Sequence, residues 1–195
     1  KAEFDRIVQQ KTCVYYGQEV YLELATSPLR YLTGGRQEGN DDVRTWTKVD
    51  KDDTFRWILS KEPKRPALVT QPTATSQVVN YGDTVYLNVR YHDRRWLTGA
   101  RGSGNYGVYT KDPAAEMDLT QHYQWQIMKN RTTIGTGPVP YEDAVNGKVF
   151  LKCLGKSSRL LTGGREGDND RVFTKDGENG TLDAHYTWII QRKVD

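Results

Sequence analysis

One short run of residues occurs three times in this chain, and it constrains the fold more than any other feature. Leu-Thr-Gly-Gly-Arg begins at Leu32 and again at Leu161, and Leu-Thr-Gly-Ala-Arg begins at Leu97. The three leucines lie about 65 residues apart, which is about a third of the 195-residue chain. A period of this length indicates a structural unit that is repeated along the chain. We therefore predict a single domain, residues 1–195, with three copies at about 1–65, 66–131 and 132–195.

Each copy contains the pattern of four β-strands. Apolar and polar residues alternate in the first strand, and the second strand ends at the glycine of the repeated run. In the fourth strand an aromatic residue, a tryptophan and an aliphatic residue occupy every second position, so we expect all three to face the core. The predicted first, second and fourth strands are residues 20–24, 30–33 and 55–59, then 85–89, 95–98 and 123–127, then 149–153, 159–162 and 186–190, and the third strands begin at Val43, Val108 and Val172.

The repeat favours a closed arrangement of these twelve strands. One copy alone is too small to form a stable core, and an open array would leave strand edges exposed. Val-x-Leu in the first strand, Leu before glycine in the second and Trp-x-Ile or Trp-x-Leu in the fourth occur in all three copies. This pattern resembles the β-trefoil superfamily over nearly the whole chain. The resemblance implies an all-β fold, a β-trefoil with three repeats of four strands.

Several trefoil families are similar to this chain in part. Ricin-B-type lectins share the threefold design and the fourth-strand tryptophan, but their Gln-x-Trp motif is absent, because Phe55, Tyr123 and Tyr186 stand two residues before the tryptophans. MIR-type and fascin-like trefoils are similar in the Tyr-Leu of the second strand, seen here at Tyr31. The resemblance implies the fold and a tendency to bind carbohydrate, and it assigns no binding residues.

The sequence contains no motif for catalysis or for a metal. Its histidines, His92, His122 and His185, form no His-x-x-x-His pair, and its two cysteines form no Cys-x-x-Cys pair. We therefore expect no catalytic residues, no metal and no cofactor. No run of 18 apolar residues predicts a membrane span. The densest basic stretch, residues 61–65, contains two prolines and indicates a connector rather than a nucleic-acid site.

The two cysteines have different sequence contexts. Cys153 occupies the first-strand position held by Leu24 and Val89 in the other copies, so we expect a buried thiol in the core. Cys13 precedes the first strand and has no cysteine counterpart. A disulfide between Cys13 and Cys153 stays open as an alternative.

An arginine and an asparagine recur at the same spacing in each copy, and they are the candidate site residues. One interpretation is structural, with Asn in a left-handed turn and Arg bonded to a neighbouring copy. The other is functional, because a guanidinium and an amide provide the donors and acceptors that sugar hydroxyls or an anionic group need. Aromatic residues that follow the third-strand valine provide a face for sugar stacking. The predicted ligand-binding residues are Arg36, Asn40, Trp46, Arg101, Asn105, Tyr109, Arg165, Asn169 and Phe173.

These features favour a non-catalytic lectin that binds glycans or glycoconjugates at up to three pseudo-equivalent shallow sites. The middle site is expected to be weaker or altered, because Ala100 replaces a glycine and no acid follows Asn105. One alternative is a trefoil that binds a protein, such as a protease inhibitor or receptor ligand, through connectors 60–77 or 129–140. Another is a fascin-like scaffold. Sequons at Asn130 and Asn179 are compatible with a secreted protein.

Overall fold

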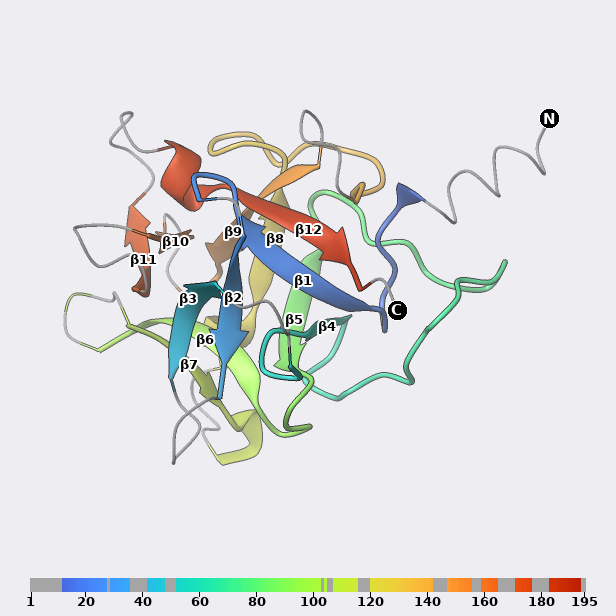
Figure 1. The fold of residues 1–195 in the computed structure, drawn as a ribbon, viewed down its shortest axis with the longest axis horizontal. Coiled ribbons are helices and arrows are strands. Elements are labelled where there is room, and N and C mark those ends of the chain that lie inside the picture. Colours follow the sequence, from blue (N-terminus) through green and yellow to red (C-terminus); the bar gives the residue numbers. More distant parts are fainter. Residues whose placement is uncertain are drawn as a thin grey trace.

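The strands of this chain form one continuous antiparallel system (Figure 1). The computed structural model describes residues 12–27, 29–35, 42–47, 52–102, 104, 107–115, 120–141, 147–155, 159–164, 171–176 and 183–193. Their elements are twelve strands and three short 3-10 helices, η2 (Pro113–Ala115), η3 (Thr120–Tyr123) and η4 (Asp183–Tyr186). Within these residues no helix has the length and apolar character needed to cross a membrane.

Six of the strands close into a barrel. Each pairs with its two neighbours in antiparallel register, and the ring is completed where β8 pairs with both β5 and β9. In order around the barrel the strands are β1 (Glu19–Leu24), β4 (Trp57–Ser60), β5 (Thr84–Val89), β8 (Trp125–Met128), β9 (Lys148–Cys153) and β12 (Trp188–Arg192).

The other six strands form three hairpins that lie together at one end of the barrel, on the left in Figure 1. Their third strands, β3, β7 and β11, contact one another. This barrel with three capping hairpins is a β-trefoil, so the predicted fold is confirmed. The hairpins are β2 (Arg30–Gly34) with β3 (Val43–Thr47), β6 (Trp96–Arg101) with β7 (Gly107–Lys111), and β10 (Arg159–Gly163) with β11 (Val172–Asp176).

The three fourth-strand tryptophans are at the centre of the core. Trp57, Trp125 and Trp188 are fully buried, as expected from the alternation of the fourth strands. The indole Nε1 of each donates a hydrogen bond to the carbonyl of the repeated second-strand leucine, at 3.0, 3.0 and 3.1 Å. Each tryptophan therefore links the barrel to its own hairpin.

The aromatic residues two positions before these tryptophans do not join the same core, which corrects the prediction of one continuous row. Phe55, Tyr123 and Tyr186 are buried in three separate clusters. The fourth strands begin only at the tryptophans, and Tyr123 and Tyr186 end the 3-10 helices η3 and η4. Strand alternation does not extend into these turns, nor into the turn at 53–55 that holds Phe55, so the three side chains turn away from the barrel interior.

The first glycine of the repeated run allows close packing between copies. A Cβ on Gly99 would lie 2.5 Å from Trp125 Cη2 and 3.0 Å from Thr174 Cγ2. Gly34 and Gly163 have the same surroundings, each between a tryptophan of its own copy and a third-strand threonine of the next. Only glycine fits at this position without displacing its neighbours.

The second position of the glycine pair requires a left-handed backbone. The φ angles are 71° at Gly35, 69° at Gly164 and 56° at Ala100. An alanine can also adopt this left-handed conformation, although at a cost in conformational energy. The middle copy therefore keeps the same turn with Ala100.

The opposite end of the barrel is closed by a ring that the sequence did not predict. Val14, Val79 and Val139 are fully buried in the segments that precede the first strands. The amide of Val14 donates to the carbonyl of Val139, that of Val139 to Val79, and that of Val79 to Val14, over 2.8–2.9 Å. Three segments far apart in sequence thus satisfy one another's backbone groups around the pseudo-threefold axis.

Neither cysteine forms a disulfide, so the alternative of a bridge is wrong. Cys153 is fully buried in the main core, as its alignment with Leu24 and Val89 predicted. Its Sγ lies 3.7 Å from the carbonyl oxygen of His122.

We expect the Cys153 thiol to resist a bulky thiol reagent in the native protein and to react fully in denaturant, because a buried thiol is inaccessible. The measurement is labelling followed by peptide mass analysis. Rapid native labelling of Cys153, or an intact mass two hydrogens too low, would contradict the assignment.

Candidate functional site

Among the repeated arginines and asparagines, the structure describes only Arg101. Its Nε donates to the buried Thr98 hydroxyl at 2.7 Å, and its guanidinium carbon lies 5.2 Å from the centre of the Tyr123 ring. Arg101 therefore contacts its own hairpin and the 3-10 helix η3. The other predicted residues of this kind, Arg36, Asn40, Asn105, Arg165 and Asn169, lie outside the described residues.

Two histidines support the hairpin bases rather than a catalytic site. His122 Nδ1 lies 2.7 Å from the carbonyl of Gly99, and His185 Nδ1 lies 2.9 Å from that of Gly163. A carbonyl only accepts, so Nδ1 carries the proton in both. Both imidazoles are therefore hydrogen-bonded to the backbone of a hairpin. In the first copy Thr54 occupies the position equivalent to these histidines. Its carbonyl accepts a hydrogen bond from the amide of Gly34 at 3.0 Å.

The outward face of the third strands carries the described candidate residues, and we call it the third-strand face. It comprises Arg44 and Trp46 on β3, Tyr109 and Lys111 on β7, and Phe173 and Lys175 on β11. The intervening residues of each strand are buried, so these side chains share the outer side. Trp46 is 40% exposed and Tyr109 is 37% exposed.

Strand register shows how the three copies correspond on this face. Arg44, Tyr109 and Phe173 are paired with the second-strand threonines, and Trp46 is one step further along, paired with Tyr31. Trp46 therefore aligns with Lys111 and Lys175, not with the other two predicted aromatics. Each strand still presents one ring and one cation, in reversed order in the first copy. In the second copy Lys111 Nζ lies 5.7 Å from the Tyr109 ring centre.

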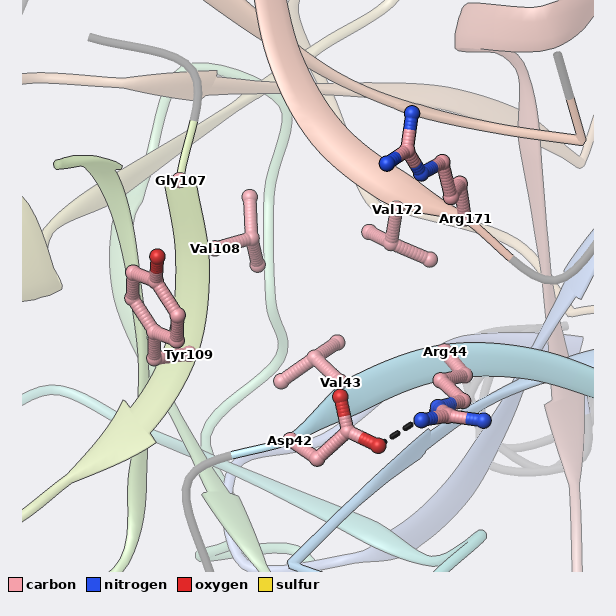
Figure 2. Close-up of a pocket in the computed structure, with 8 residues that line it drawn as sticks. All are labelled: Asp42, Val43, Arg44, Gly107, Val108, Tyr109, Arg171 and Val172. Atoms are coloured by element: carbon pink, nitrogen blue, oxygen red, sulfur yellow. Dashed lines mark hydrogen bonds and ion pairs between the residues drawn. The ribbon is translucent and has the colours of Figure 1, made fainter. Parts of the chain in front are cut away.

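A pocket of about 350 Å³ lies where the three third strands meet. Figure 2 shows Val43, Val108 and Val172 facing one another as its apolar base. Asp42 and Arg44 form an ion pair of 2.5 Å at its edge. The remaining lining residues are Gly107, Tyr109 and Arg171.

This axial pocket combines an apolar base with guanidinium, carboxylate and phenol groups. Such a surface suits a ligand that has both an apolar face and hydroxyl or charged groups, as sugars have. Within the part of the chain that the structure describes, no group of three or more His, Cys, Asp or Glu side chains is placed to hold a metal ion. Sequence alone did not predict the pocket, because its residues come from three copies.

Comparison with known proteins places the chain by its fold. No family model and no curated protein sequence matches it. A mosquitocidal holotoxin has a similar structure, with a TM-score of 0.62, 13% identity and coverage of 93% of this chain but 18% of the toxin. An SDF2-like protein from Arabidopsis thaliana matches with a TM-score of 0.57, 16% identity and coverage of 91% and 94%.

A lectin from Polyporus squamosus, solved with the epitope Neu5Aca2-6Galb1-4GlcNAc, is also similar, with a TM-score of 0.57, 13% identity and coverage of 92% of this chain and 50% of the lectin. Identities this low show a shared fold alone. The chain is a β-trefoil, similar in structure to trefoils that include lectins.

Proposed function

We propose that this β-trefoil is a non-catalytic carbohydrate-binding protein, and that glycans bind at up to three shallow sites on the third-strand face. The observation that carries the proposal is the pairing of one aromatic ring with one cation on each third strand. Core packing does not account for this recurrence, because the ring and the cation of each strand point away from the core.

A ring beside a cation suits the chemistry of a sugar. The apolar face of a pyranose packs on an aromatic ring, and a guanidinium or ammonium group donates to hydroxyl or carboxylate oxygens. Trp46 offers the largest ring and lies two residues from Arg44. A cation at each site favours glycans with acidic groups, since a charged acceptor forms the stronger hydrogen bond.

The three sites are expected to differ in strength. In the first copy the Arg44 guanidinium is partly neutralised by Asp42. In the second copy the Lys111 ammonium lies 5.7 Å from the Tyr109 ring centre, so part of its charge interacts with its own ring rather than with a ligand. Weak single sites become effective on a surface that carries many glycans, because the second contact is intramolecular.

We expect Trp46→Ala and Tyr109→Ala each to remove one site in a calorimetric titration with the strongest-binding glycan of an array. The melting temperature should change little, because surface substitutions outside the core alter stability by about 0.5 kcal/mol or less. Tyr91→Ala is the matched control, since Tyr91 is 53% exposed and lies off the third-strand face. An unchanged stoichiometry in both site variants would contradict the proposal.

A second candidate function is protein binding through the connectors. Leu68 is 42% exposed on the first connector and Ile134 is 44% exposed on the second. Exposed large aliphatic side chains on both connectors suit a protein partner. A chain that binds no glycan, and a protein ligand that is lost on Leu68→Ser, would favour this alternative.

A further inference from the structure

We infer that a cleft beneath the first connector binds an oxyanion, a sulfate or phosphate group carried by a ligand. We call this site, of about 260 Å³, the connector cleft. It lies on the side of the barrel, between the start of β1, the end of β12 and residues 68–70 of the connector, which runs at the right of Figure 1. It shares no residue with the axial pocket or the third-strand face, so it does not depend on the proposed function.

The connector cleft has an excess of positive charge. Among the described residues, its lining has one carboxylate, that of Glu19, and the cations Arg56, Arg90, Arg192 and Lys193. Glu19 is already engaged, because Arg90 Nε lies 2.6 Å from its Oε1 and Lys193 Nζ lies 3.4 Å from its Oε2. Like charges held this close repel one another, and a bound anion would relieve that repulsion.

Donors remain for such an anion. Arg56 binds Asp53 through Nη1 at 2.9 Å, and its Nε is buried with no acceptor among the described residues. Arg90 donates through Nε, and neither of its Nη groups has a hydrogen-bond partner within the described part of the chain. A buried N–H without an acceptor is unfavourable, and a tetrahedral oxyanion supplies several strong acceptors at once.

Two cations of the connector cleft, Arg56 and Arg90, are not required by the fold. The positions of Arg56 and Arg90 hold neutral residues in the other two copies, yet those copies form the same strands. The threefold repeat would therefore permit neutral residues here as well. The counterparts are Gln124 and Thr187 for Arg56, and Leu154 and Ala25 for Arg90.

The connector forms a fixed wall of the cleft. Val69 N donates to the carbonyl of Gly17 at 2.9 Å. Arg65 ties the same segment to β5, with Nε donating to Asn88 Oδ1 at 2.5 Å and Nη2 to the Val89 carbonyl at 2.8 Å. Leu68 lines the cleft and is partly exposed, so it offers an apolar contact to the body of a ligand whose oxyanion meets the arginines.

The test is calorimetric titration of the whole chain with inorganic sulfate and inorganic phosphate at constant ionic strength. One site per chain is expected. Arg56→Gln and Arg90→Leu, which install residues found at the equivalent positions of another copy, should weaken binding about tenfold or more, because each removes charge-assisted hydrogen bonds. Lys148→Thr is the matched control, since it removes an exposed cation from the start of β9, away from the cleft.

Titrations with glucose 6-sulfate and glucose 6-phosphate then show whether the ligand carries a sulfate or a phosphate group. Binding of either compound that is tighter than binding of the matching inorganic ion supports the site. Trp46→Ala should leave sulfate binding unchanged, which separates this inference from the glycan proposal. Two results would overturn the inference: no binding of either inorganic ion, or an equal loss in Lys148→Thr and Arg56→Gln while all variants keep the native melting temperature.

Discussion

Trp125→Ala is expected to lower the free energy of unfolding by about 3 to 5 kcal/mol, as truncations of large aromatic side chains in cores do. The indole is fully buried. Its loss leaves a cavity and removes the 3.0 Å hydrogen bond to the Leu97 carbonyl, which would remain buried without this donor. A domain is stable by only about 5 to 15 kcal/mol, so the variant should melt far below the parent or fail to fold.

Trp46→Ala is the control for this experiment. It removes the same side chain from a position that is 40% exposed, so the melting temperature should change little. The measurement is thermal or urea unfolding followed by tryptophan fluorescence and circular dichroism. If Trp125→Ala unfolds like the parent, the tryptophan rows do not form the core described here.

Gly99→Ala is the second change with a large expected effect. The added Cβ would lie 2.5 Å from Trp125 Cη2 and 3.0 Å from Thr174 Cγ2. The indole cannot easily move away, because its Nε1 is bonded to Leu97. Overpacking of a core lowers the free energy of unfolding by about 1 to 3 kcal/mol. We expect the loss for Gly99→Ala to lie at or above the upper end of that range.

Gly34 and Gly163, the equivalent glycines of the other copies, complete a graded series. The nearest side-chain contact of an added Cβ is 2.8 Å at Gly34 and 3.1 Å at Gly163. We therefore expect the loss of stability to decrease from Gly99→Ala through Gly34→Ala to Gly163→Ala. Urea unfolding of the three variants measures the order. Equal losses would show that the backbone, rather than the contact with tryptophan and threonine, requires glycine here.

The sequence predicted the strands and the main core because both follow from local alternation repeated three times. It placed Trp125 and Cys153 correctly, since each aligns with buried residues in the other copies. It misplaced Tyr123, because a 3-10 turn before the tryptophan interrupts the strand period that the pattern suggested. The ring at Val14 was not predicted, because its hydrogen-bond partners lie more than 60 residues away in the sequence.

The axial pocket and the connector cleft were harder to predict than the fold, because each is built from residues of several copies. The axial pocket joins valines of all three, and the connector cleft joins Arg56, Arg90 and Arg192 from three different copies. Only Trp46, Tyr109 and Phe173 of the predicted binding residues are on the described surface, together with Arg101 at a hairpin base. The repeated glycine of the run has a structural cause, so repetition alone does not identify a binding residue.

A glycan array probed with the parent chain and with the triple variant Trp46→Ala, Tyr109→Ala, Phe173→Ala tests the central claim most directly. We predict that the parent binds one class of glycans, with acidic members favoured, and that the triple variant loses this binding while keeping the parent's circular dichroism spectrum. A blank array for the parent, or full binding by the triple variant, would contradict a carbohydrate site on the third-strand face.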